Sequence, residues 1–199
     1  MPTDLSDTLV VGIAATALFD LREADAFFQA QMAAEPATAL QAYRQHMLER
    51  EQEPLADGTA MPLVRALLGL NRFQPEGDRR ALVEVVVLSR NSPETGLRVL
   101  HAIRERQLPI IRHAFTGGES VVDYLEAFAV DLFLTTNPGD AQRVIDSGQC
   151  AAAHLKPPPR EGLAPPEDQV RIAFDGDAVL FADASGVDRK STRLNSSHS

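Results

Sequence analysis

Short apolar segments recur along the first 155 residues and are separated by stretches with helical periodicity. The apolar segments are rich in Val, Ile, Leu, Phe and Ala, which is typical of strands buried on both faces of a parallel sheet. They cover residues 8–15, 82–88, 110–115, 130–135 and 150–155. Helical patterns occupy residues 63–71, 97–107, 121–128 and 137–148. Strands that alternate with helices in this way indicate βαβ units, so the chain is predicted to have an α/β fold with a parallel sheet.

A longer helical region, residues 22–50, stands between the first two predicted strands. Pro36 divides it into two helices, because proline lacks the amide hydrogen that a helix interior needs. Residues 49–58 then form a turn, and Pro62 opens the helix of residues 63–71.

The rest of the chain differs in composition. Residues 156–168 carry five prolines, which favours a linker or surface loop over a strand. Residues 170–174 predict one more strand, which leads into Asp175, Gly176 and Asp177. Residues 189–199 have one large apolar side chain and a Ser, Arg and Asn bias, so we expect them to be unstructured. This tail looks like translated vector or adapter sequence.

Composition and charge narrow the class of protein. The 199 residues are 44% hydrophobic and 24% charged, as in an ordinary globular protein. The net charge of −9 argues against broad electrostatic binding to nucleic acid or to an anionic membrane. The single cysteine, Cys150, cannot form an internal disulfide, and neither a signal peptide nor a membrane-spanning stretch is recognisable. We therefore expect a cytoplasmic protein.

The most informative candidate residues are Asp175 and Asp177. Residues two apart in a strand point to the same side, so both carboxylates would project beyond the carboxyl end of a parallel strand. Two carboxylates so close favour either a bound cation or a shared proton, and both arrangements suit phosphoryl chemistry. The alternative is a plain turn, because Asp-Gly is also the strongest hairpin signal.

Polar residues follow three further predicted strands. Ser89 comes directly after residues 82–88, where its hydroxyl and the amides of Arg90 and Asn91 could bind a phosphate. The same residues could instead begin the next helix, and the two interpretations are compatible. The other strand ends carry Thr116, Gly117 and Gly118, and Thr135, Thr136, Asn137 and Asp140.

Several strings of residues resemble the cytosolic type I 5′-nucleotidases, members of the haloacid dehalogenase-like superfamily. They are ALFDL (17–21), LSRNSPETGLRV (88–99), AFTGGES (114–120), DLFLTTN (131–137) and RIAFDGDAVLFAD (171–183), in unbroken order. The resemblance implies a haloacid dehalogenase-like three-layer fold with a parallel central sheet and a helical cap insertion. It also implies Mg²⁺-dependent hydrolysis of nucleoside 5′-monophosphates such as AMP, through an aspartyl-phosphate.

Specific roles follow from the resemblance. Asp175 would be the nucleophile, Asp177 the general acid and base, and Ser89 the phosphate ligand of the superfamily's second motif. The remaining candidates for phosphate or substrate binding are Arg90, Asn91, Thr116, Gly117 and Gly118. Mg²⁺ would be held by Asp175 and Asp177, with Asn137 and Asp140 as candidates for its other contacts.

The resemblance also divides the chain into expected parts. Residues 1–21 and 59–156 would form the core, residues 22–58 the helical cap, and residues 157–169 the linker. Residues 170–185 would add the core strand with the two aspartates, truncated after it, and residues 186–199 the non-native tail. The first strand, residues 10–20, weakly echoes residues 172–182 but has Ile13, Ala14 and Ala15 opposite the aspartates. It supplies no nucleophile.

Three features depart from the family pattern. Glu126 stands where relatives have Lys in YLKAF, and Ala14, Ala15 and Thr16 replace a Ser-Ser-Arg run. The helical region that follows the aspartates in relatives is also replaced by the tail. Two alternatives to a 5′-nucleotidase therefore stay open: a phosphatase of another small phosphomonoester, and a homologue that binds nucleotides without hydrolysing them. A nucleoside monophosphate is the expected partner, and the chain could also form a homo-oligomer.

Overall fold

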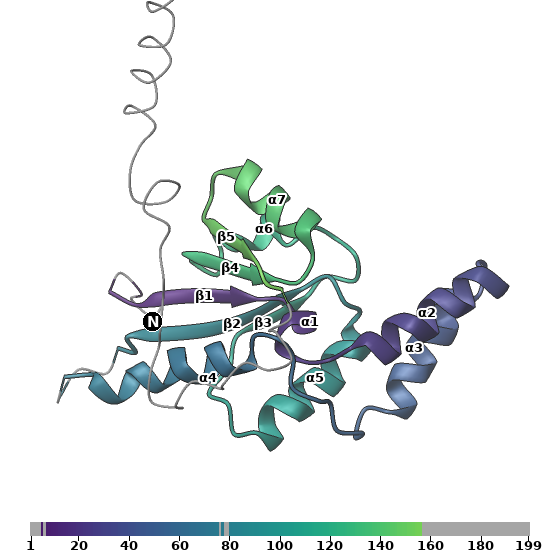
Figure 1. The fold of residues 1–199 in the computed structure, drawn as a ribbon, viewed down its shortest axis with the longest axis horizontal. Coiled ribbons are helices and arrows are strands. Elements are labelled where there is room, and N and C mark those ends of the chain that lie inside the picture. Colours follow the sequence, from purple (N-terminus) through teal and green to yellow (C-terminus); the bar gives the residue numbers. More distant parts are fainter. Residues whose placement is uncertain (1–4, 6, 76, 78–79, 157–199) are drawn as a thin grey trace, which may run out of the picture. The chain divides into compact units, whose positions relative to one another are not determined.

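The computed structural model describes residues 5, 7–75, 77 and 80–156 (Figure 1). The strands are β1 Leu9–Ile13, β2 Val83–Ser89, β3 His113–Phe115, β4 Leu132–Thr135 and β5 Ala151–His154. The α-helices are α1 Ala15–Leu18, α2 Arg22–Ala34, α3 Ala39–Glu49, α4 Met61–Gly69, α5 Pro93–Glu105, α6 Val122–Leu125 and α7 Pro138–Ser147. A short 3-10 helix, η1 Leu70–Phe73, follows α4.

The five strands form one parallel sheet in the order β3-β2-β1-β4-β5. β1 lies in the middle, where Val11 is paired with Val85 of β2 and with Leu132 of β4. The chain builds the sheet outward from β1 to β3 and then returns to place β4 on the other side of β1. This reversal makes the carboxyl ends of β1 and β4 the topological switch point, where open α/β sheets bind ligands. The predicted α/β fold with a parallel sheet is confirmed.

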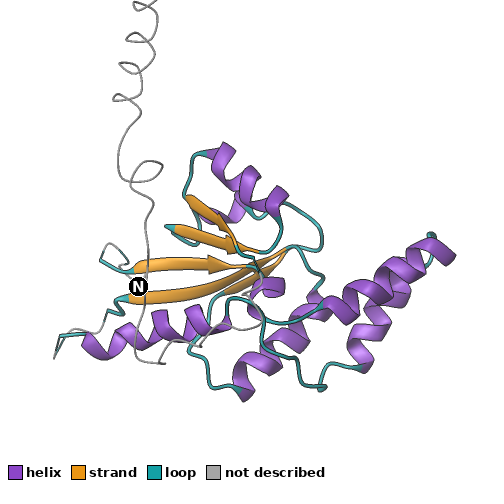
Figure 2. Cartoon of the chain, viewed as in Figure 1, coloured by secondary structure: helices purple, strands orange, loops and turns teal. Residues whose placement is uncertain are grey.

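Helices cover both faces of the sheet (Figures 1 and 2). α4 and α5 lie on one face, and α6 and α7 on the other. The strands are apolar on both sides for this reason: Val85, Val86, Val87 and Leu88 of β2 are all fully buried. The exception in β2 is Glu84, whose carboxylate accepts two hydrogen bonds from Arg112, at 2.7 and 2.8 Å.

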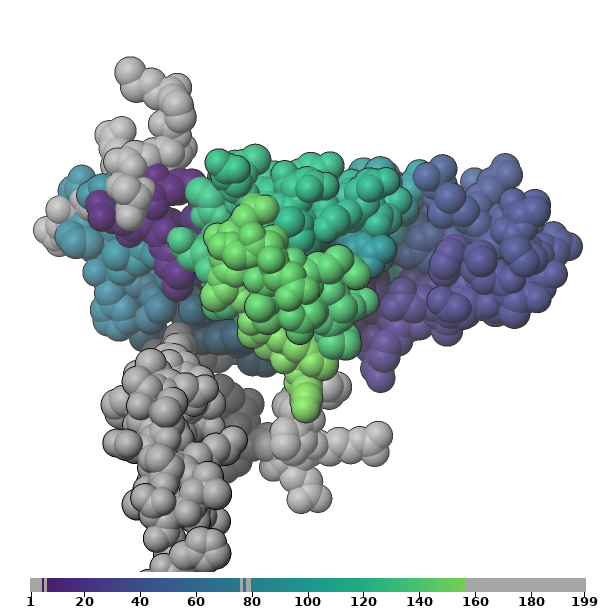
Figure 3. Space-filling model, turned by 90° about the horizontal axis from the view of Figure 1, so that it is seen from above, coloured from purple at the N-terminus to yellow at the C-terminus, as the bar shows by residue number. Residues whose placement is uncertain are grey.

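The two helices of the long insertion, α2 and α3, pack on each other as a hairpin beyond the carboxyl ends of the strands (Figure 1). Figure 3 shows them standing out as a lobe. The hairpin has a small core of its own, made by Ala24, Tyr43 and Met47. The Tyr43 hydroxyl joins it to α5 through a 2.9 Å hydrogen bond with Thr95 Oγ1.

Several predicted boundaries were wrong. The first strand ends at Ile13 because the Ala14 amide makes the last ladder bond, to Leu134, and the short helix α1 then begins. Helix α5 begins at Pro93 rather than at residue 97, with Ser92 accepting the Thr95 amide at its N-terminus. β3 has three residues instead of six, because only 113–115 pair with β2. α6 is a single turn.

Some expectations concern residues outside the described part of the chain. These are the Pro-rich linker of residues 157–169, the strand of residues 170–174 with Asp175 and Asp177, and the tail of residues 186–199. The division into core, helical cap and linker stays a prediction. Within residues 5–156, so far as they are described, no helix is both long enough and apolar enough to cross a membrane.

Gly58 permits the close return of the chain to the sheet after the α2–α3 hairpin. Its amide donates to the Leu18 carbonyl at 2.9 Å, and a Cβ there would lie 2.4 Å from the Ala17 carbonyl oxygen. We predict that Gly58→Ala lowers the free energy of unfolding by about 2–3 kcal/mol, because backbone must shift to admit the methyl group. The matched control is Gly69→Ala in α4, where a Cβ meets nothing within 4 Å. Equal urea midpoints for the two variants would contradict this account.

Candidate functional site

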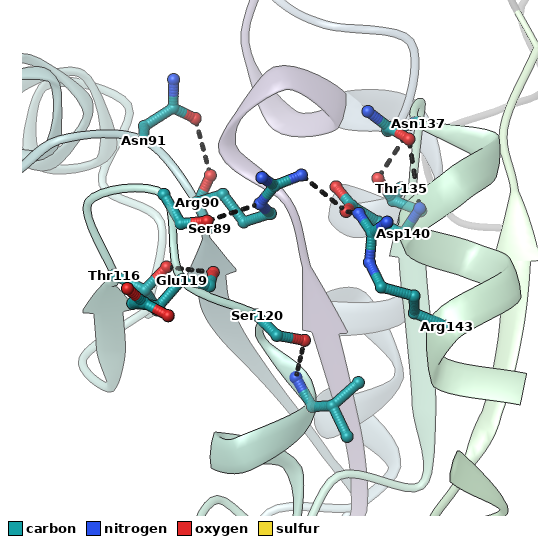
Figure 4. Close-up of polar contacts among 12 residues, drawn as sticks. Ser89, Arg90, Asn91, Thr116, Glu119, Ser120, Thr135, Asn137, Asp140 and Arg143 are labelled. Atoms are coloured by element: carbon teal, nitrogen blue, oxygen red, sulfur yellow. Dashed lines mark hydrogen bonds and ion pairs between the residues drawn. The ribbon is translucent and has the colours of Figure 1, made fainter. Parts of the chain in front are cut away.

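The carboxyl ends of β1, β2, β3 and β4 bring four loops together, as the sequence predicts for a parallel sheet. The loops begin at Ala14, Arg90, Thr116 and Thr136. Figure 4 shows the side chains of the last three and the contacts between them. The hydrogen bonds within each loop decide which of its donors and acceptors are left for a ligand.

Ser89 lies at the end of β2 and is only 2% exposed. Its hydroxyl donates to Asn91 Oδ1 at 2.7 Å and accepts from the Ala15 amide at 3.3 Å. Ser89 therefore provides a hydrogen-bond acceptor for a backbone amide in the first turn of α1, and its hydroxyl orients the Asn91 side chain. In this structure the hydroxyl hydrogen that could be donated to a phosphate is donated to Asn91, and phosphate binding by Ser89 stays a prediction.

The Thr116 loop is hydrogen-bonded to the Ser89 loop along its backbone. The Thr116 amide donates to Ser89 O at 2.9 Å, the Gly117 amide to Asn91 O at 3.1 Å and the Gly118 amide to Arg90 O at 2.8 Å. Gly117 and Gly118 have φ values of 64° and 110°, which glycine adopts without strain. The loop can thus follow its neighbour closely, and its amides are aimed at carbonyl groups rather than at solvent.

Arg90 connects the two sides of the switch point. Its Nε donates to Gly118 O at 3.0 Å, and its Nη1 lies 3.3 Å from Asp140 Oδ1 (Figure 4). Asp140 also pairs with Arg143 one turn further along α7. Above the central strand, the Thr16 and Thr136 hydroxyls are 3.1 Å apart. Hydrogen bonds and an ion pair therefore link α1, the loops after β2 and β3, and the segment that follows β4 at this edge of the sheet.

Asn137 and Asp140, the candidates for metal contacts, have structural roles in this arrangement. Asn137 Oδ1 accepts the Asp140 amide at 3.1 Å and so begins α7. The Asp140 carboxylate, in the first turn of the helix, complements the positive end of the helix dipole and is neutralised by Arg90 and Arg143. Asn137 and Asp140 stay predicted candidates for metal contacts. Within residues 5–156, as far as they are described, no group of three His, Cys, Asp or Glu side chains could hold a metal.

Asp175 and Asp177, the predicted catalytic pair, lie outside the described residues. The end of the central strand itself carries Ala14 and Ala15, both buried, and no acidic side chain. Glu126, which replaces the lysine of the family pattern, is exposed directly after α6. Among the described residues, the end of the central strand therefore supplies no carboxylate that could act as a nucleophile.

A pocket beside these loops was not predicted from the sequence. It has a volume of about 290 Å³ and lies between the α2–α3 hairpin and the loops after β2 and β3. Its lining includes Asp25, Phe28, Tyr43 and Arg44 from the hairpin, and Arg90, Asn91, Gly117 and Gly118 from the loops. The hairpin residues follow ordinary helical periodicity. The sequence therefore showed only that this pair of helices carries aromatic and charged side chains, which does not by itself indicate a pocket. Their convergence on the loops required the tertiary structure.

Two pKa values near this pocket are raised. That of Asp25 is raised first by partial desolvation and second by the negative charge of Asp20. That of Tyr43 is raised chiefly by burial, which outweighs the hydrogen bond to Thr95. Asp25 is exposed, and no cation is paired with its carboxylate among the described residues.

The described residues form an α/β fold with a five-stranded parallel sheet and polar loops at its carboxyl edge. The chain matches the family model described as 5′-nucleotidase over residues 1–198, and it belongs to that family. It is 26% identical over 186 residues to human cytosolic 5′-nucleotidase 1B. The match covers 92% of this chain and 29% of the relative, so the chain spans less than a third of that protein's length. No solved structure matches it.

Replacing Ser89 tests its structural role. We predict that Ser89→Ala lowers the free energy of unfolding by about 1–3 kcal/mol, because the buried Ala15 amide loses its acceptor and Asn91 loses its donor. Chemical denaturation followed by circular dichroism measures the change. Thr116→Val is the comparison, since the Thr116 hydroxyl is bonded at an exposed position. A Ser89 variant as stable as the parent would contradict the assigned hydrogen bonds.

The raised pKa of Asp25 predicts a pH-dependent effect on stability. An acid with a raised pKa in the folded state favours folding when it is protonated, and this contribution is lost as pH rises from its ordinary value of 3.8 through the folded-state pKa. Asp25→Asn should therefore be more stable than the parent at pH 7, and the difference should vanish below about pH 3.8. Thermal unfolding across this range measures the effect. A variant less stable than the parent at pH 7 would show that the carboxylate is well compensated.

Proposed function

We propose that this protein is a 5′-nucleotidase that hydrolyses nucleoside 5′-monophosphates, AMP among them, to nucleoside and phosphate. The observation that carries the proposal is the family match, which extends through the FDGDAVLF string that contains Asp175 and Asp177. The parallel sheet supports it, because phosphoryl-transfer sites are commonly built at the carboxyl ends of such strands. The haloacid dehalogenase-like architecture is part of the same proposal.

The proposed chemistry rests on two carboxylates with different tasks. The Asp175 carboxylate attacks phosphorus while the bond to the ribose 5′-oxygen breaks, and Asp177 protonates that leaving oxygen. Asp177, now ionised, then takes a proton from water, which attacks the aspartyl-phosphate and releases phosphate with Asp175 regenerated. One residue can act as acid and then as base because the first step leaves it in the protonation state that the second requires.

Mg²⁺ is part of the proposal through the family and through the acidic pair. A divalent cation bound at Asp175 and Asp177 would neutralise charge on the phosphate oxygens. Asn137 and Asp140 stay candidates for its other contacts, although in this structure Asn137 accepts the Asp140 amide and Asp140 is paired with Arg90. Phosphate contacts from Ser89, Arg90, Asn91, Thr116, Gly117 and Gly118 stay predictions. The relative's name places it in the cytosol, and we propose the same location here.

One observation favours a second candidate function, binding of nucleotides without hydrolysis. Glu126 places a negative charge where the family pattern has lysine, and anionic charge near a transferring phosphoryl group opposes catalysis. Hydrolysis of a different phosphomonoester is the remaining alternative. A panel of AMP, other nucleoside monophosphates and sugar phosphates separates these candidates by the rate of phosphate release.

The mechanism predicts that Asp175→Asn abolishes phosphate release from AMP. The amide cannot form the aspartyl-phosphate, so the full-length protein should lose about three orders of magnitude or more in kcat, while its folding is unchanged. Release of phosphate with Mg²⁺ and with EDTA is the measurement, and Glu126→Lys serves as the companion variant, in which turnover should rise. Hydrolysis that survives Asp175→Asn would exclude the covalent route. Absence of hydrolysis in the parent and in Glu126→Lys, with AMP still bound, would favour the binding function.

A further inference from the structure

His46 lies on α3 and contacts α2 within the hairpin. Its ring is stacked on the Phe27 ring of α2, with ring centroids 3.9 Å apart and ring planes 13° from parallel. Phe27 also packs against the small hairpin core of Ala24, Tyr43 and Met47. Because this core is small, the hairpin depends on contacts such as the stack, and units of this kind open more readily than the centre of a sheet.

The surroundings of the His46 ring fix its protonation state. Its Nδ1 lies 2.9 Å from Nη1 of Arg50, one turn further along the chain and directly after α3. A guanidinium group can only donate, so Nδ1 is the acceptor and the single proton of the ring is on Nε2. Nε2 is buried and has no hydrogen-bond partner within the described part of the chain. The observed geometry therefore requires a neutral imidazole.

A second proton on the ring, at Nδ1, would break this arrangement. It would turn an N–H group toward the N–H group of Arg50 and place a positive charge beside an existing one. The charged groups that act on the ring come from three helices and the residue after α3: Glu49 on α3, Arg50 after it, Glu23 on α2 and Arg98 on α5. The two glutamates favour the protonated ring, but burial of the ring and then Arg50 outweigh them, so the pKa of His46 is lowered from its ordinary value of 6.5. The Phe27 ring would attract an imidazolium, yet this attraction leaves the repulsion from Arg50 unchanged.

Three contacts that join the hairpin and the segment after it to α5 do not depend on this proton. The Tyr43 hydroxyl is hydrogen-bonded to another hydroxyl group on α5. The Arg98 Nε donates to the Glu53 carbonyl at 3.1 Å. The His101 Nδ1 lies 3.0 Å from the Glu51 carbonyl oxygen, and a ring nitrogen that donates to a carbonyl keeps its hydrogen when the ring is protonated. The hairpin therefore stays attached to α5 when the bond between His46 and Arg50 is broken.

We infer that His46 and Arg50 form an acid-sensitive latch of the α2–α3 hairpin: protonation of His46 in mild acid releases Arg50 and lets α2 and α3 separate more readily, while the sheet stays folded. The released Arg50 has another partner within reach, since its Nε already lies 3.4 Å from Glu53 Oε2. The hairpin forms one wall of the pocket beside the loops after β2 and β3, so acid loosens that wall. The latch acts on the hairpin itself and does not depend on the proposed function.

The test is hydrogen exchange of the full-length protein at about pH 7 and about pH 5.5, followed by mass spectrometry of peptides from the hairpin and from β1 and β2. An open hairpin binds the proton more tightly than a closed one, so the stability of the hairpin is lost as pH falls from 6.5 through the lower pKa of the closed state. After correction for the direct effect of pH on exchange, the hairpin peptides should exchange about twofold to tenfold faster at the lower pH, and the strand peptides should not change. About tenfold is the ceiling, because pH 5.5 lies about one unit below the ordinary pKa of histidine.

Two variants make the comparison specific to His46. His46→Asn keeps a side-chain oxygen that can accept from Arg50 but cannot be protonated, so its hairpin should show no acid-induced increase in exchange. His113→Gln is the matched control, because His113 is an exposed histidine on β3, outside the hairpin. It should behave as the parent does.

Arg50→Gln gives a second measurement that decides the question even if His46→Asn opens the hairpin at both pH values. It removes the positive charge beside the ring, so the pKa of His46, followed by NMR of the imidazole, should be higher than in the parent. Two results would overturn the inference. One is an acid-induced increase in hairpin exchange that persists in His46→Asn, and the other is a pKa of His46 that is the same in the parent and in Arg50→Gln.

Discussion

The pairing of β1 with both β2 and β4 constrains the rest of the structure. A strand with two parallel partners has its backbone fully hydrogen-bonded, and helices on both faces of the sheet bury its side chains: Val10, Val11 and Ile13 are all 0% exposed. β1 also defines the switch point, because the chain adds β2 and β3 on one side before β4 and β5 on the other. The loops that meet at its carboxyl end are therefore close in space although they come from residues 14, 89 and 136.

At that edge, polar groups are satisfied mainly by one another. The Ser89 hydroxyl accepts a hydrogen bond from the Ala15 amide, and the Gly117 and Gly118 amides donate to the carbonyl groups of Asn91 and Arg90. The Asp140 carboxylate is paired with two arginines. A loop cluster with so many internal partners is rigid, and a ligand at its centre would have to replace existing hydrogen bonds. Beside it, the pocket lined by Arg44, Phe28 and Tyr43 keeps donors and an aromatic surface available. Arg90 belongs to both, since it is paired with Asp140 and also lines the pocket.

Much of the fold was predictable, because parallel strands buried on both faces leave continuous apolar runs. The runs at 82–88 and 130–135 became β2 and β4 with changes of one or two residues. The short helices α1 and α6 were harder to predict, since each is a single turn whose formation depends on contacts with other elements. In α1, for example, the Ala15 amide donates to the hydroxyl of Ser89, 74 residues away in the sequence. The presence of polar strand ends was predicted correctly, but the partners of Ser89, Arg90 and Asp140 could not be read from spacing. Those partners come from different strands.

The sequence by itself determined the family, the alternation of strands and helices, and the acidic Asp-Gly-Asp string, because each is a property of local residue order. Only the tertiary structure decided that Asp140 would be paired with Arg90, and that the α2–α3 hairpin would bring Phe28, Tyr43 and Arg44 to the loops after β2 and β3. The physical reason is that strand order and helix packing, rather than position along the chain, decide which side chains share one edge of a sheet.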